Sequence, residues 1–153
     1  YTPVSGKELD AFGKLTLEDM GKNIKRNTEY TSSDAGGLTH EQGAYEYAVI
    51  GCESNTERMP DGKITRLHNF QLRRLMLDCG ATIAKHCRLE PEVLFVHRGI
   101  LTISSDKGVF TLAAGDLFTC PIGLSKSFSN ASNEPVEVVI VRGGDYPSSA
   151  VFD

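Results

Sequence analysis

The chain has 153 residues, of which 40% are hydrophobic and 24% charged, and its formal net charge is −4 at pH 7. This length and composition are typical of one globular domain with a substantial core. The negative charge argues against a nucleic-acid partner, and no apolar run reaches the roughly 20 residues of a membrane-spanning helix. With no signal or transit peptide visible, we expect a cytoplasmic protein.

The N-terminal part of the chain is expected to be helical and then irregular. Residues 1–30 contain a capping-box sequence at Ser5–Glu8 and a weaker one at Thr16–Asp19. Residues 31–44 are rich in Thr, Ser and Gly, which predicts a loop or an arm. The apolar residues that would form a narrow stripe on one or two short helices are Leu15, Met20 and Ile24.

Short β-strands are predicted for the rest of the chain. Alternating residues predict a strand at Tyr45–Val49, and the Ser104–Gly108 turn predicts a hairpin. On the strand that begins at Glu92, Leu94 and Val96 should share the face of Glu92. The predicted strands are Tyr45–Val49, Leu72–Leu77, Glu92–Arg98, Ile100–Ile103, Val109–Leu112 and Val136–Val141. Strands of this length with glycine-containing turns indicate a mainly β sandwich or barrel.

Two spaced motifs lie within this β-rich part. The first has Gly80, His86, Arg88, Glu92 and Gly99, and the second has Gly115, Pro121, Gly123, Lys126 and Asn130. The spacings resemble the two motifs of the cupin superfamily, G-x5-H-x-H-x3-4-E-x6-G and G-x5-P-x-G-x2-H-x3-N. The resemblance implies a single cupin barrel, a double-stranded β-helix or jelly roll, with a short helical N-terminal extension. We therefore divide the chain into an extension with a first strand, residues 1–65, and a barrel domain, residues 66–153.

In the cupin superfamily three histidines and one glutamate hold a divalent metal inside the barrel. Here Arg88 and Lys126 stand at the second and third histidine positions, and a cationic side chain has no lone pair to donate to a metal. No tightly bound cofactor is therefore expected. The alternative is Fe, Mn, Ni or Zn held by His86 and Glu92, with His68 as the best additional ligand.

The expected site contains His86, Glu92 and Lys126 as candidate catalytic residues. Arg88, Lys126, His86 and Arg73 are the candidate ligand-binding residues, Arg73 because it can line the barrel. In one interpretation, Arg88, Glu92 and Lys126 form an internal salt-bridge cluster. In the other, their excess positive charge binds a small anionic molecule, with Arg88 gripping a carboxylate or phosphate in fork geometry. His86 would shuttle protons, and Glu92 would orient its ring.

The other histidines and the cysteines give weaker signals. His97 should face away from Glu92 on the same strand, and His40 falls in the loop-like segment. The four cysteines form no C-x-x-C pair, which predicts buried free thiols in a reducing compartment. A catalytic thiol at Cys87 or Cys120 is the alternative.

Three functions remain open from the sequence. The leading hypothesis is a barrel that binds a small anionic molecule, and if it is an enzyme, the resemblance implies a metal-free isomerase, epimerase or lyase. The alternatives are a metal-dependent cupin dioxygenase and a non-catalytic structural or oligomerisation barrel. The resemblance also implies a homodimer, for which the strand at Tyr45–Gly51 is a candidate for exchange between copies. No nucleic-acid or membrane partner is expected.

Overall fold

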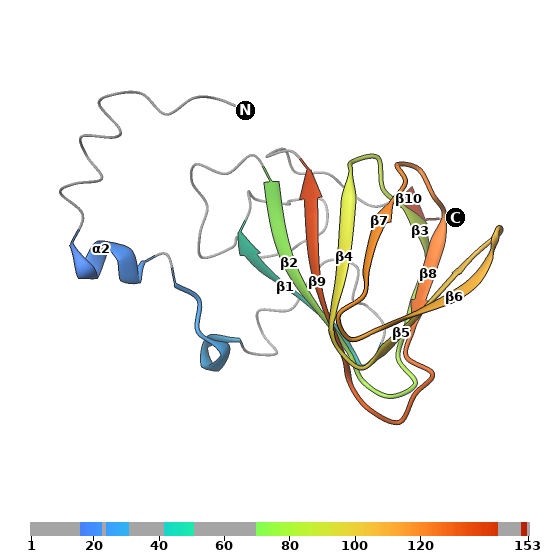
Figure 1. Cartoon of the computed structure of the whole chain (residues 1–153), viewed down its shortest axis with the longest axis horizontal. Helices are drawn as coiled ribbons and strands as arrows, with labels where there is room; N and C mark the ends of the chain where they lie inside the picture. The colour runs from blue at the N-terminus through green and yellow to red at the C-terminus, as the bar shows by residue number, and fades with distance from the viewer. Residues whose placement is uncertain (1–15, 23, 31–41, 51–69, 144–150, 153) are drawn as a thin grey trace.

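Two five-stranded antiparallel sheets pack face to face in the computed structural model, which describes residues 16–22, 24–30, 42–50, 70–143 and 151–152 (Figure 1). The first sheet has the order β1 (Ala44–Ile50), β2 (Phe70–Leu77), β9 (Val136–Gly143), β4 (Glu92–Arg98) and β7 (Leu117–Cys120). The second has the order β10 (Val151–Phe152), β3 (Thr82–Cys87), β8 (Lys126–Ser129), β5 (Ile100–Ser105) and β6 (Gly108–Ala113). The predicted mainly β barrel is confirmed.

The inner face of the first sheet changes from apolar to polar along the strands. Register places Leu75, Val138 and Val96 in one cross-strand row, and all three are buried in the apolar core. A second cross-strand row begins four residues before Leu75 on β2 and is polar. It consists of Gln71, Arg142, Glu92 and Cys120. Because alternate residues of a strand share a face, this polar row also points into the barrel. One end of the barrel is therefore an apolar core and the other is lined by polar groups.

The predicted strands agree with the observed ones. Glu92–Arg98 is observed with the predicted bounds, and the remaining predicted strands lie within the observed strands or one residue from an end. His97 is exposed while Leu94 and Val96 are buried, as the alternation predicted. β1 pairs with β2 of the same chain, from Ala44 opposite Leu77 to Ile50 opposite Leu72.

The N-terminal extension contains α2 (Leu17–Gly21) and the 3-10 helix η1 (Asn27–Glu29). The predicted capping box at Thr16 is present, since Asp19 N donates to Thr16 Oγ1 at 3.1 Å and Thr16 N donates to Asp19 Oδ2 at 3.0 Å. The predicted apolar stripe does not pack into the core of the described chain, because Met20 and Ile24 are exposed and α2 buries no residue. Ser5–Glu8 and Leu15 lie outside the described residues.

Two turns depend on particular residues. Gly99 has φ of 80°, and a Cβ built on it would lie 2.5 Å from the carbonyl oxygen of Pro135, so only glycine fits there. Asn130 is buried, and its amide donates to the carbonyl oxygens of Leu77 at 3.1 Å and Glu134 at 2.7 Å. Asn130 Oδ1 accepts from Ser132 Oγ at 2.6 Å. These contacts tie the loop before β9 to the end of β2.

Cysteines 79, 87 and 120 are free thiols. The prediction that the thiols are buried holds for Cys120 and is wrong for Cys79, which is exposed in the turn between β2 and β3. A turn residue has neighbours on one side only, so its burial cannot follow from the usual preference of cysteine. Among the described helices, none has the length and apolar character needed to cross a membrane.

Candidate functional site

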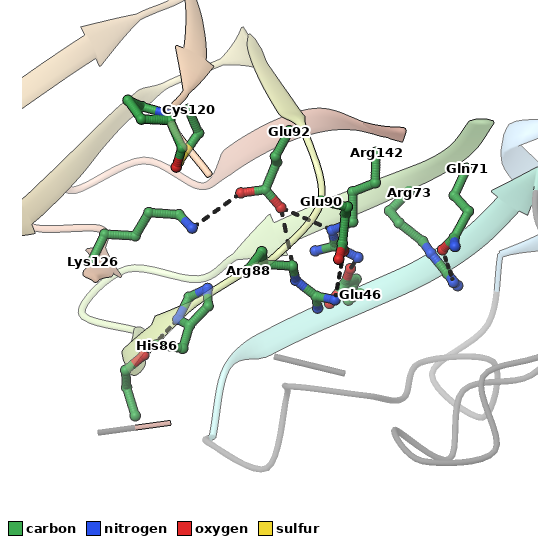
Figure 2. A network of polar contacts seen from close by, with 12 residues as sticks. Glu46, Gln71, Arg73, His86, Arg88, Glu90, Glu92, Cys120, Lys126 and Arg142 are labelled. Atoms are coloured by element: carbon green, nitrogen blue, oxygen red, sulfur yellow. Dashed lines mark hydrogen bonds and ion pairs between the residues drawn. The ribbon is translucent and has the colours of Figure 1, made fainter. Parts of the chain in front are cut away.

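Polar and charged side chains that are almost wholly buried meet at the polar end of the barrel (Figure 2). They come from both sheets: β1, β2, β4 and β9 of the first, and β3, β8 and the segment after β3 of the second. The group consists of Glu46, Gln71, Arg73, His86, Arg88, Glu92, Lys126 and Arg142. We call these residues the polar cluster. Charges buried to this degree are stable only when they are paired and hydrogen-bonded.

Glu92 is the centre of the polar cluster. Its Oε2 accepts from Arg142 Nε at 2.8 Å, and Arg88 Nε lies 3.9 Å from the same oxygen. Its Oε1 faces Lys126 Nζ at 3.2 Å. One carboxylate is thus shared by three cations, which Figure 2 shows converging on it from three directions.

The pKa of Glu92 reflects this competition. Burial raises the pKa, but the charges of Arg142, Lys126 and Arg88 and the hydrogen bond from Arg142 outweigh burial and lower the pKa to about 2. Glu92 is therefore ionised at every physiological pH. An internal salt-bridge cluster requires an ionised Glu92 between Arg88 and Lys126, and the structure meets this requirement.

Two further carboxylates pair with the arginines. Glu46 Oε1 accepts from Arg142 Nη1 at 2.9 Å, and Glu90 Oε1 accepts from Arg88 Nη1 at 3.3 Å. Sequence reasoning did not include Glu46, Glu90 or Arg142 in the site. A signal existed for two of them: Arg142 continues the inward alternation of Val138 and Ile140, and Glu46 lies between the small buried residues Ala44 and Ala48.

Arg73 is buried inside the barrel, as expected for one of two successive arginines on a strand, while Arg74 faces outward. Its Nη2 donates to Gln71 Oε1 at 2.8 Å. In Figure 2 this pair lies beyond Arg142, on the side away from Lys126. The structure therefore brings together His86, Arg88, Glu92 and Lys126 and places Arg73 at the margin of the polar cluster.

His86 is directly opposite Lys126 in the register between β3 and β8. Its Nδ1 lies 2.8 Å from the carbonyl oxygen of Ala84. A carbonyl only accepts, so Nδ1 carries the proton and the lone pair is on Nε2. The prediction that Glu92 orients this ring is wrong, because Glu92 is held by the cations and the Ala84 carbonyl orients His86. Burial is the main reason that the pKa of His86 falls below its usual value, and Lys126 and Arg88 act in the same direction.

Cys120 lies beside Glu92 in the first sheet, with its Sγ 3.7 Å from the carbonyl oxygen of Pro121. Burial raises the pKa of its thiol, and the charge of Lys126 only partly opposes this effect. The thiol is therefore protonated and weakly nucleophilic at neutral pH. Cys87, the other candidate thiol, points to the opposite face of β3 from His86.

The polar cluster does not fit the divalent metal that the motif resemblance implies. Both oxygens of Glu92 face cations, and a divalent ion about 4 Å from one such cation would be repelled by about 8 kcal/mol at an effective dielectric constant of 20. No group of three His, Cys, Asp or Glu side chains with metal-binding geometry occurs among the described residues. His68, the proposed third ligand, lies outside these residues, as does His40.

Comparison with known proteins identifies the fold. Residues 74–142 match the family described as Cupin domain. A polyketide cyclase from Streptomyces resistomycificus superposes with a TM-score of 0.60 and 15% identity over 84% of both chains. A conserved barrel domain protein of the Cupin 2 family from Salinispora arenicola gives a TM-score of 0.56 and 17% identity over 78% of this chain and 90% of that one.

The chain also spans about half of a cupin-superfamily sugar phosphate isomerase from Silicibacter pomeroyi, with 25% identity, a TM-score of 0.47 and coverage of 50% of this chain and 52% of that chain. No curated protein matches this sequence. The two motifs, the paired antiparallel sheets and the matches to cupin barrels lead to the same assignment. Residues 74–142 therefore form a cupin domain, and the chain has the fold of the cupin barrels.

Proposed function

We propose that this cupin barrel binds a small anionic molecule at Lys126, without a tightly bound catalytic metal. The observation that carries the proposal is the environment of the Lys126 ammonium. It has no exposed surface, and its contact with Glu92 Oε1 at 3.2 Å does not have the geometry of a hydrogen bond. An ammonium has three N–H donors, so this one retains donors for a further acceptor.

The charge of the polar cluster supports the same proposal. Arg73, Arg88, Lys126 and Arg142 are four cations, and the carboxylates that accompany them are Glu46, Glu90 and Glu92. His86 adds no charge at neutral pH, because its pKa is lowered. The charges of these seven described groups sum to +1, and a positive surrounding favours an anion over a cation.

The ion pairs suggest which cation contacts the anion. Arg88 is already engaged by Glu90 at 3.3 Å, and Arg142 by Glu46 at 2.9 Å and Glu92 at 2.8 Å. We therefore assign the first contact to Lys126 and a supporting charge to Arg88. A lysine contact is a point charge, which selects for an anion without requiring the planar geometry that an arginine fork imposes.

His86 gives the proposed site a proton acceptor beside the anion. Its Nε2 lone pair and the Lys126 ammonium come from residues that face each other across two strands. Lys126 would stabilise a developing oxyanion or enolate while His86 removes a proton. If the protein is an enzyme, this pair favours a metal-free isomerase, epimerase or lyase acting on a small carboxylate.

The proposal is tested by anion-dependent stabilisation. Thermal unfolding of the wild type is measured in sodium phosphate, sodium malonate and sodium chloride at equal ionic strength. A bound anion raises the melting temperature, because a ligand at 100 times its Kd adds about 2.7 kcal/mol to stability. We expect this gain to vanish in Lys126→Met and to persist in Lys107→Met, whose lysine is exposed in the turn between β5 and β6.

A structural role for the polar cluster is the second candidate, favoured by the sharing of Glu92 among three cations. In that case neither phosphate nor malonate would stabilise the wild type beyond chloride. Replacing the pair together, Glu92→Leu with Lys126→Met, would also keep more stability than Glu92→Leu alone. The absence of stabilisation by both phosphate and malonate would refute the ligand-binding proposal.

A further inference from the structure

Lys126 is the one primary amine among the described cations of the polar cluster. The other cations are guanidinium groups, those of Arg73, Arg88 and Arg142. A guanidinium stays protonated, whereas a buried lysine amine can add to a carbonyl carbon and form a Schiff base. The remaining described lysines are exposed or half-buried: Lys22, Lys25, Lys85 and Lys107. Within the described residues, carbonyl chemistry at a buried amine is therefore confined to Lys126.

The surroundings of this amine suit an iminium ion better than an ammonium ion. An ammonium has three N–H donors, and Lys126 Nζ is buried without a hydrogen-bond partner among the described residues. Buried donors that lack acceptors are destabilising. A protonated Schiff base keeps the positive charge that faces Glu92 Oε1 at 3.2 Å, but it has a single N–H donor. Condensation with a carbonyl group therefore removes two unsatisfied donors and preserves the ion pair.

The Phe128 ring provides an apolar boundary on another side of the same cation. Lys126 Nζ lies 5.8 Å from the ring centroid, and Phe128 is buried in the apolar core. The face of an aromatic ring attracts an iminium as it attracts an ammonium. Figure 2 shows the Lys126 side chain extending toward Glu92, well inside the barrel. A position enclosed in this way limits the access of water, which would hydrolyse an imine.

We propose that Lys126 forms a Schiff base with a small α-keto acid. The amine adds to the keto carbon, the oxygen leaves as water, and a C=N bond replaces the C=O bond. Of the three protons on the ammonium, two leave in the water and one stays on the iminium nitrogen, so no oxidant or reductant is required. His86, opposite Lys126 in the register, transfers the first proton from nitrogen to oxygen. This inference rests on the proposed function, because it uses the same site and names the class of anion.

Charge and spacing favour an α-keto acid over other carbonyl compounds. The positive surroundings of the amine favour a carbonyl compound that carries a carboxylate. Lys126 Nζ faces one oxygen of Glu92 at 3.2 Å, and Arg88 Nε lies 3.9 Å from the other oxygen. Two cations that face the two oxygens of one carboxylate are close together, so a ligand that interacts with both has its carbonyl and carboxylate close together. In an α-keto acid these groups are on adjacent carbon atoms.

The test is reductive trapping on the full wild-type chain. The protein is incubated with sodium pyruvate and sodium cyanoborohydride, which reduces an iminium to a stable secondary amine. Intact-mass and peptide mass spectrometry then measure and locate the product. We expect one pyruvate unit per chain, on the peptide that contains Lys126. The rate should exceed that at exposed Lys107 about 100-fold, the lower end of what proton transfer by a positioned side chain contributes.

Two variants separate covalent chemistry from charge. Lys126→Arg keeps the positive charge but has no primary amine, so it should lose the adduct and retain the stabilisation by malonate. Lys107→Met should retain both. If Lys126→Arg does not fold, the peptide map of the wild type still locates the adduct. An absence of adduct at Lys126, or labelling spread over the exposed lysines instead, would overturn the inference.

The stabilisation assay distinguishes failure of this inference from failure of the proposed function. Stabilisation by malonate without a pyruvate adduct would leave anion binding intact and overturn the Schiff base. A pyruvate adduct at Lys126 without stabilisation by phosphate or malonate would support the amine chemistry and refute reversible anion binding. Propanal, a neutral carbonyl compound, tests the substrate class. If propanal labels Lys126 as fast as pyruvate does, the assignment to α-keto acids is wrong.

Discussion

Arg142 changes the meaning of the two cationic substitutions in the motifs. From the sequence, Arg88 and Lys126 alone seemed to separate this barrel from a metal-binding one. In the structure the shortest contact to Glu92 is the one from Arg142 Nε, at 2.8 Å. Glu92 is held by a residue outside both motifs, so three cationic side chains rather than two oppose a metal ion at this carboxylate.

Restoring two histidines should therefore not restore metal binding. We expect the double variant Arg88→His, Lys126→His to bind Co²⁺ weakly, because Arg142 still pairs with the Glu92 carboxylate. Adding Arg142→Gln should strengthen binding by at least tenfold. The measurement is titration with Co²⁺, followed by its visible absorption and by calorimetry. Tight binding by the double variant would show that a metal ion displaces Arg142 from the Glu92 carboxylate.

His86 should be neutral at pH 7, with its proton on Nδ1, because its pKa is lowered by burial. The Ala84 carbonyl at 2.8 Å accepts the Nδ1 proton. Long-range nitrogen–proton correlation spectra of the ring distinguish this tautomer directly. The ring of exposed His97 gives a reference signal in the same spectra. A protonated His86 at pH 6 would remove its role as a proton acceptor.

The limits of the sequence at this scale have a physical cause. The motif spacings correctly brought His86, Arg88, Glu92 and Lys126 together, because those spacings reflect positions on neighbouring strands. They could not show that Glu92 is held by cations while a backbone carbonyl orients His86. Competition between partners for one carboxylate depends on distances of a few tenths of an ångström, which strand alternation does not determine.

At the scale of elements, some turns require only a positive φ, whereas others also leave no room for a Cβ atom. Gly80 and Gly99 have φ of 79° and 80°, but only at Gly99 would a Cβ meet another atom, 2.5 Å from the Pro135 oxygen. The pair therefore separates backbone strain from steric overlap.

Gly80→Ala should lower the free energy of unfolding by about 1–2 kcal/mol, the cost of a left-handed backbone for a residue with a side chain. Gly99→Ala should cost at least about 2 kcal/mol more, because the β4–β5 turn must move away from the backbone of Pro135. Urea denaturation of both variants measures the difference. Equal losses would mean that the turn shifts without cost.

The strands were more predictable than the N-terminal extension. Strand alternation is fixed by the pleat and by burial on one side, so β4 and β9 could be located from their apolar residues. The helical stripe of Met20 and Ile24 follows the same logic, yet both residues are exposed. A sequence pattern shows that a surface is apolar, but not which chain covers it.

At the scale of the whole molecule, the polar cluster joins the two sheets. The contact between Glu92 of β4 and Lys126 of β8 crosses from one sheet to the other. The apolar end of the barrel holds the sheets together by packing and the polar end by charge. The stability of the molecule should therefore depend on pH through this end.

Acid should destabilise the protein as Glu92 becomes protonated. The pKa of Glu92 is about 2 when folded and near 4.5 when unfolded, so its contribution is complete above pH 4.5 and is lost as the pH falls toward 2. The shift corresponds to about 3 kcal/mol. Urea denaturation between pH 6 and pH 2 measures this slope. The control variant is Glu134→Gln, because Glu134 is exposed and lies outside the polar cluster.

Replacing Glu92 by Gln should flatten the slope in this window while lowering stability at neutral pH by about 3–5 kcal/mol, since it leaves buried cations without their shared carboxylate. If Glu92→Gln does not fold, a carboxyl carbon titration of the wild type gives the same pKa. A Glu92 that titrates near 4.5 in the folded protein would contradict the ion-pair network.

The two hydrogen bonds from the Asn130 amide have a consequence for producing this protein. Asn130-Ala131-Ser132 is an acceptor sequence for N-linked glycans, which eukaryotic secretory hosts attach to the amide nitrogen of asparagine. In the folded chain that nitrogen is buried and donates to Leu77 and Glu134. A glycan added during synthesis would prevent the loop from closing onto β2. Secreted material should therefore be either unglycosylated at Asn130 or misfolded, and Asn130→Gln would not rescue it.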